Sequence, residues 1–163
     1  MSGNNVHERK SPRLKDFDYS TTGAYFVTIC TKDRRKLFST VGADSISAQM
    51  IERIFIETID RYNGVESPIY VVMPDHFHAI ITIFRGDMES APTLSEIIQS
   101  FKRYSTIEYI KMVKRGLAVP FDKKLWQRSF YDHVIRNRED YDAVVRYIHE
   151  NPKRWLLKSN STP

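Results

Sequence analysis

Two histidines, one tyrosine and one asparagine are the residues of this sequence that are best suited to chemistry. His76 and His78 are separated by one residue inside the apolar run 76–84. Alternate residues of a β-strand point to the same side, so both imidazoles face the same way if this run is a strand. Because neutral imidazole nitrogen is a good metal ligand, the pair can supply two arms of a metal site. The alternative is that two unrelated histidines lie on a half-buried sheet face.

Tyr147 and Asn151 form the second half of the pattern. They lie four residues apart in a segment whose apolar residues recur at helical spacing, and residues four apart are neighbours on one side of a helix. A tyrosine can act as a covalent nucleophile, and an asparagine carbonyl oxygen can complete a metal site that histidines have begun. Taken alone, Tyr147 can equally be a packing residue at the core edge, and Asn151, directly before Pro152, a helix terminator.

The hydrophobic pattern predicts the elements that must position these residues. Strands are predicted over four runs in which β-branched and aromatic residues are frequent, namely 24–31, 69–73, 76–84 and 126–135. Helices are predicted over about 45–62, from a capping box at Thr93, and from Asn137 to a stop at Pro152. This order is that of a ferredoxin-like split βαβ sandwich, an α+β fold with helices packed on one face of an antiparallel sheet. An added C-terminal helix carries Tyr147.

The basic residues are concentrated in the second part of the chain. Residues 101–163 carry 14 Lys and Arg against 7 Asp and Glu, whereas residues 1–100 carry 11 against 13. Such clustering suits a polyanion such as nucleic acid. For Lys102 and Arg103 the alternative is a solvated helix face, for His133 an edge-strand surface position, and for Trp126 an anchor in the core. The residues that we expect to contact nucleic acid are Arg34, Arg35, Lys102, Arg103, Trp126, Arg128, His133 and Arg136.

Five segments resemble the HUH-type single-tyrosine transposases, the IS200-like transposases, and especially their REP-associated tyrosine transposase branch. In the family's order they are Gly-Ala-Tyr-Phe at 23–26, Met-Pro-Asp-His-Phe-His at 73–78, Trp-Gln at 126–127, Asp-His-Val-Ile-Arg at 132–136 and Tyr-Ile-His-Glu-Asn-Pro at 147–152. The resemblance implies that His76 and His78 bind a divalent metal ion, Mg²⁺ or Mn²⁺, and that Asn151 takes the place of the third ligand. It also implies that Tyr147 is the nucleophile.

The activity implied by this resemblance is that of a metal-dependent single-strand DNA endonuclease and strand transferase. Its substrate would be hairpin or palindromic DNA, and its intermediate a 5′-phosphotyrosine. Many REP-associated relatives continue further beyond the Asn-Pro segment, so a mobile element's own transposase or a domesticated relative with another hairpin target stays open. The competing hypothesis is a non-catalytic single-stranded nucleic-acid-binding domain of ferredoxin-like fold, the architecture of RNA-recognition domains.

The length and composition fit one domain. A chain of 163 residues with 41% apolar residues can bury a single core. We predict one catalytic domain over 16–157 between polar, flexible tails at 1–15 and 158–163, as either a monomer or a homodimer. No apolar stretch approaches a membrane span, and 1–15 lacks the apolar region of a signal peptide, so we expect a cytoplasmic protein. The single cysteine, Cys30, excludes a disulfide framework and a cysteine-based zinc cage.

Overall fold

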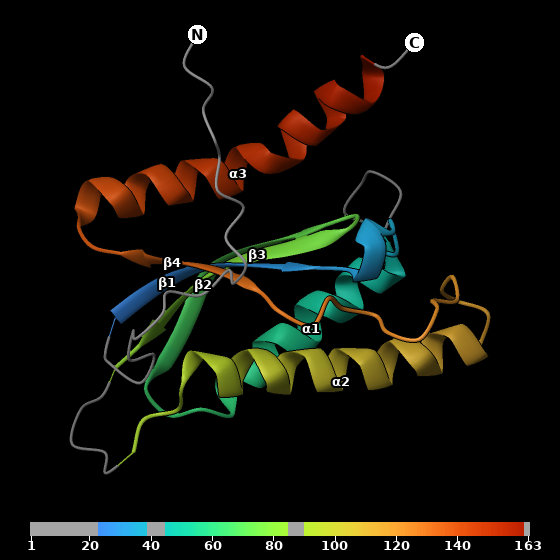
Figure 1. Ribbon diagram of the computed structural model, residues 1–163, viewed down its shortest axis with the longest axis horizontal. Helices are drawn as coiled ribbons and strands as arrows, with labels where there is room; N and C mark the ends of the chain where they lie inside the picture. The colour runs from blue at the N-terminus through green and yellow to red at the C-terminus, as the bar shows by residue number, and fades with distance from the viewer. Residues whose placement is uncertain (1–22, 39–44, 85–89, 162–163) are drawn as a thin grey trace, which may run out of the picture.

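The computed structural model describes residues 23–38, 45–84 and 90–161, so the predicted N-terminal tail lies outside it. One antiparallel sheet has the order β2-β3-β1-β4 and is built from β1 (Gly23–Cys30), β2 (Val65–Met73), β3 (His76–Ile83) and β4 (Tyr131–Ile135). Three helices pack on it, namely α1 (Ile46–Asp60), α2 (Leu94–Lys114) and α3 (Arg138–Asn160). Figure 1 shows α1 and α2 on one face of the sheet and α3 on the other. The predicted ferredoxin-like sandwich with an added C-terminal helix is confirmed.

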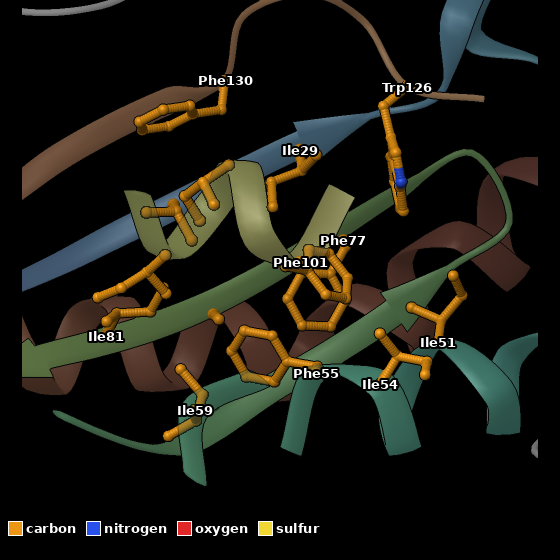
Figure 2. Close-up of a cluster of buried hydrophobic side chains, with 14 of the residues drawn as sticks. Ile29, Ile51, Ile54, Phe55, Ile59, Phe77, Ile81, Phe101, Trp126 and Phe130 are labelled. Carbon is orange, nitrogen blue, oxygen red and sulfur yellow. The ribbon is translucent and has the colours of Figure 1, made fainter. Parts of the chain in front are cut away.

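The main core lies between the sheet and the pair α1 and α2. Phe55 of α1 and Phe101 of α2 meet Phe77 of β3 there, with ring centroids 4.6 and 5.1 Å from that of Phe77 (Figure 2). Burying a phenylalanine side chain contributes roughly 1.5–3 kcal/mol, so this contact holds the two layers together. The predicted capping box begins α2, where Thr93 and Glu96 bond to each other's backbone amides.

α3 packs on the opposite face of the sheet through a smaller hydrophobic core. Val144 and Ile148 of α3 pack with Ile80 of β3. Because side chains alternate along a strand, Phe77 enters the main core while His76 and His78 share the face of Ile80. The two histidines therefore lie on the face of the sheet that α3 covers.

The structure corrects two predicted boundaries around this face. The fourth strand begins at Tyr131, not at 126, and Trp126 makes only an isolated bridge to Thr31, because Trp126 and Phe130 both turn into the main core. Pro152 lies inside α3, which continues to Asn160, so residues 158–160 belong to a helix and not to a tail. Proline removes one backbone hydrogen bond of a helix, and α3 bends away from the sheet toward its C-terminal end (Figure 1).

The second strand is also longer than predicted. β2 begins at Val65 and contains Pro68, and its register against β3 shifts between Glu66 and Ile69. Proline is tolerated in an edge strand with such an irregularity, and β2 is an edge of this sheet. Among the described helices, none has the length and apolar character needed to span a membrane.

Candidate active site

A cavity of about 440 Å³ lies between α3 and the sheet. His76 and His78 of β3 line it from the sheet, and Tyr147 and Asn151 line it from α3. Arg34, from the 3-10 turn Lys32–Arg34 after β1, forms another part of the wall. Residues from distant parts of the sequence thus meet in one place.

The two histidines are buried and close to each other. Their ring centroids are 4.6 Å apart. The Nδ1 atom of His76 is 2.5 Å from Asp75 Oδ1, and that of His78 is 2.8 Å from Thr28 Oγ1. We assign the ring proton to Nδ1 in both residues, because an acceptor faces each of these atoms. The Nε2 atoms then carry the lone pairs.

Burial keeps both imidazoles neutral. Burial, helped by the nearby His76 and Arg34, lowers the pKa of His78 to about 3. Burial also lowers the pKa of His76, against the opposing effects of Asp75 and of a hydrogen bond between His76 and the Asn151 side chain. Neutral imidazole is the form that binds a metal ion.

These residues fit a metal ion at one specific atom. His78 Nε2 is buried and finds no hydrogen-bond partner among the residues that the structure describes, which is an unfavourable state for a polar atom unless a ligand satisfies it. No three His, Cys, Asp or Glu side chains of the described residues form a group able to hold a metal. A metal ion bound by the two histidines would therefore take its third protein ligand from the amide of Asn151.

Tyr147 stands at the wall of the cavity with its ring held from two sides. The ring centroid lies 5.4 Å from that of His78 and 5.8 Å from that of Phe26. Phe26 in turn stacks on His78 at 5.3 Å. The side chain is nevertheless 40% exposed, so a large substrate can reach it.

The depressed pKa of His78 predicts how stability changes with pH in the metal-free protein. As the pH falls below 6.5, the unfolded chain takes up a proton at His78 that the folded chain does not bind until about pH 3. The free energy of unfolding therefore decreases over this window, by up to about 1.4 kcal/mol per pH unit for this group. We expect His78→Gln to lose that part of the slope when denaturant unfolding is measured with chelator at pH 7, 6 and 5. Equal slopes would contradict it.

Most of the residues predicted to contact nucleic acid lie outside the cavity. Among them, only Arg34 lines it. His133 lies on the same sheet face, but its Nε2 bonds both carboxylate oxygens of Asp140 at the start of α3. This contact lowers the pKa of the Asp140 carboxyl. Four more of the predicted contacts are exposed but do not line the cavity, namely Arg35, Arg103, Arg128 and Arg136.

Trp126 and Lys102 have structural partners that the sequence prediction did not anticipate. The Trp126 ring is buried among Phe38 and Phe101 and its Nε1 donates to Ser105 Oγ at 2.9 Å, so it offers no free face to a base (Figure 2). Lys102 Nζ donates to the carbonyl oxygens of Gln127 and Ser129 at 2.8 and 3.1 Å. Its ammonium group ties α2 to the loop before β4.

Replacing Lys102 with methionine should therefore destabilise the fold and leave DNA affinity unchanged. Hydrogen bonds to a charged group are worth about 1–3 kcal/mol, and methionine keeps most of the apolar stem. Lys111→Met is the matched control on the same helix, because Lys111 makes an exposed ion pair with Glu108 and should cost little. Urea unfolding measures the stability of both variants, and a DNA-binding titration measures their affinity. Unchanged stability with weaker DNA binding would restore Lys102 as a DNA contact.

Arg154 and Lys158 were missed, and Trp155 was not placed in the cavity, because the helix was predicted to stop at Pro152. Arg154, Trp155 and Lys158 continue the stripe of Tyr147 and Asn151 at helical spacing and line the same cavity. Extending that stripe through the proline was the signal that could have found them. Thr28, Cys30 and Tyr131 complete the lining from β1 and β4.

The antiparallel sheet, with the histidine pair of β3 facing the tyrosine of α3 across one cavity, agrees with the family resemblance found in the sequence. The chain belongs to the IS200-like transposases, since the family model "Transposase IS200 like" matches residues 20–151. Members of this family are tyrosine transposases, enzymes that cleave and rejoin DNA.

Individual relatives agree with this membership. A Haemophilus influenzae protein of uncharacterised function is 28% identical over 175 residues, covering 92% of this chain and 91% of the relative. The REP-associated tyrosine transposase of Escherichia coli K12 is 29% identical over 147 residues, covering 89% and 76%. A solved structure of a REP-associated tyrosine transposase bound to a REP hairpin aligns with a TM-score of 0.60 and 25% identity, covering 87% of this chain and 74% of that one.

Proposed function

We propose that this transposase is a metal-dependent single-strand DNA endonuclease and strand transferase that uses Tyr147 as its nucleophile. The observation that carries the proposal is the single cavity lined by Tyr147, His76, His78 and Asn151. The hairpin-bound relative supports hairpin DNA as the substrate class. The exposed cavity wall and its cationic residues suit a phosphodiester strand.

His76, His78 and Asn151 would hold the metal ion, with Mg²⁺ and Mn²⁺ as the candidates. When bound, such an ion polarises the phosphodiester and offsets the negative charge that develops at the reacting phosphate. Arg34 and Arg154 line the same cavity and add fixed positive charge for the strand. None of the described residues that line it is acidic, so none of them repels a polyanion by negative charge.

The reaction forms one bond to phosphorus, breaks one, and moves one proton. The Tyr147 oxygen loses its proton and forms a bond to phosphorus, while the bond from phosphorus to the 3′-oxygen breaks and that oxygen takes up a proton. The products are a 5′-phosphotyrosine and a free 3′-hydroxyl. Because the phosphodiester bond is exchanged for a tyrosyl ester, a 3′-hydroxyl can reverse the step without ATP.

The test is covalent capture of DNA. The full chain is incubated with Mn²⁺ and a pool of hairpin oligonucleotides that carry randomised single-stranded flanks and a label on the 3′ end. We expect a labelled protein band on a denaturing gel that chelator prevents. A label at the 5′ end should instead leave with the released strand, and its retention on the protein would contradict the proposed polarity. A pool that yields no adduct under any label would overturn the proposal.

A further inference from the structure

A buried carboxylate beside the histidine pair has no part in the chemistry above. Asp75 lies in the turn between β2 and β3 and is only 6% exposed. Its Oδ1 is 2.5 Å from His76 Nδ1, and its Oδ2 is 3.2 Å from Arg34 Nε. A buried carboxylate is unfavourable unless it is paired, and here each oxygen has a partner. Asp75 thus bridges Arg34 and His76.

The backbone around Asp75 is held independently of its side chain. The Asp75 carbonyl oxygen accepts hydrogen bonds from both the backbone amide and the hydroxyl of Thr31, at 2.9 and 3.0 Å. The amide of Phe38 donates to the carbonyl of the neighbouring Pro74 at 3.1 Å. The turn can therefore keep its shape when the carboxylate is changed.

Arg34 reaches Asp75 from a backbone conformation that is unusual for a residue with a side chain. Asp33 and Arg34 have φ values of 57° and 54°, a left-handed conformation that costs roughly 1–2 kcal/mol per residue. The guanidinium of Arg34 also donates to Cys30 Sγ at 2.8 Å. Such strain persists where surrounding contacts fix it, and here the contacts are those that bring Arg34 to Asp75.

We infer that Asp75, held by Arg34, is a positioning residue that fixes the tautomer and orientation of His76. By accepting a hydrogen bond from Nδ1–H, the carboxylate leaves the Nε2 lone pair on the side of the cavity, where Asn151 also lies. At the same position His78 faces the neutral hydroxyl of Thr28, whereas His76 faces a carboxylate, so His76 is the more strongly polarised of the two. The inference rests on the proposed function in one respect, because the ligand at Nε2 is the proposed metal ion.

The variant Asp75→Asn tests this role because it removes the charge and keeps the size. Asp33→Asn is the matched control. It makes the same change in the adjoining turn at a largely exposed side chain whose ion pair is with Lys32, and asparagine tolerates the left-handed backbone there. We expect the Mn²⁺ dissociation constant, measured by calorimetry on the full chain, to rise about 10- to 100-fold in Asp75→Asn and to stay unchanged in Asp33→Asn.

The ring proton of His76 is a second readout that needs no metal and no activity. Nitrogen-15 NMR of the metal-free protein should show the Nδ1–H tautomer in the wild type and in Asp33→Asn, and a mixture in Asp75→Asn. A merely structural role in the turn would change neither tautomer nor affinity. The wild-type spectrum alone shows which nitrogen of His76 carries the proton, even if Asp75→Asn does not fold.

The outcomes separate this inference from the proposed function. An Nε2–H or mixed tautomer in the wild type overturns the role of Asp75, as does an Asp75→Asn protein that binds Mn²⁺ as tightly as the wild type. If the wild type binds no Mn²⁺, the proposed metal site fails, and the tautomer measurement still decides whether Asp75 orients His76.

Discussion

Tyr147→Phe is expected to abolish both DNA cleavage and the covalent protein–DNA adduct while folding and DNA binding survive. Phenylalanine keeps the ring that contacts His78 and Phe26 and deletes the one atom able to attack phosphorus. Removing the nucleophile of an enzyme that works through a covalent intermediate costs at least about 10³-fold in rate. Single-turnover cleavage and the adduct band measure the loss, and thermal unfolding with a binding titration measures what is retained.

Tyr131 and Tyr141 are the tyrosines against which this result is judged. Tyr131 lines the same cavity from β4 and is 52% exposed, whereas Tyr141 packs against the small core under α3. Tyr131→Phe should still form the adduct. If Tyr147→Phe formed the adduct and Tyr131→Phe did not, the nucleophile would be Tyr131, and the role given to α3 would be wrong.

The faces of β3 and α3 could be predicted because each depends on a local period. A strand alternates sides at every residue, which placed His76 and His78 together opposite Phe77. A helix repeats every three to four residues, which placed Tyr147 and Asn151 together beside the buried Val144. The histidine face of β3 and the Tyr147 face of α3 oppose each other because α3 packs on that side of the sheet. The roles of the residues within the cavity stay predictions.

The errors arose where a local preference was overruled by packing between distant residues. Proline is a frequent helix terminator, yet α3 continues through Pro152. The ring centroid of Trp155 therefore lies 6.0 Å from that of His76. The hydrogen bonds of Lys102 lead to a loop 25 residues further along the chain, and no pattern in α2 indicates them. The pairing of the Asp75 carboxylate with Arg34, 41 positions earlier in the chain, is likewise not indicated by any local pattern.

The competing hypothesis of a non-catalytic nucleic-acid binder loses support for two reasons. The family to which the chain belongs consists of enzymes that cleave and rejoin DNA. The structure also buries Trp126, the residue expected to stack on bases, and keeps Tyr147 accessible above two neutral imidazoles. An accessible tyrosine over two buried imidazoles is the arrangement that the proposed catalysis requires.

His78→Ala should fail in a different way from Tyr147→Phe, because it removes a proposed metal ligand and leaves the nucleophile in place. His78 Nε2 is a buried atom for which the described part of the chain supplies no hydrogen-bond partner, so its loss removes the position that best fits a metal ion. Changes to groups that merely support metal ligands cost about 10- to 100-fold in affinity, so loss of a ligand should weaken Mn²⁺ binding by more than about 100-fold. Cleavage should slow with it and recover in part when Mn²⁺ is raised, which Tyr147→Phe cannot do.

His133→Ala is the matched control for this loss of an imidazole. His133 lies on the same face of the sheet but bonds Asp140 and does not line the cavity, so Mn²⁺ affinity should stay at the wild-type value. Calorimetric titration of the three proteins, followed by single-turnover cleavage across Mn²⁺ concentrations, separates the effects. If His78→Ala bound Mn²⁺ like the wild type, the ion would lie elsewhere. If His133→Ala lost Mn²⁺ instead, the metal site would lie nearer β4, and the lone pair of His78 would need another explanation.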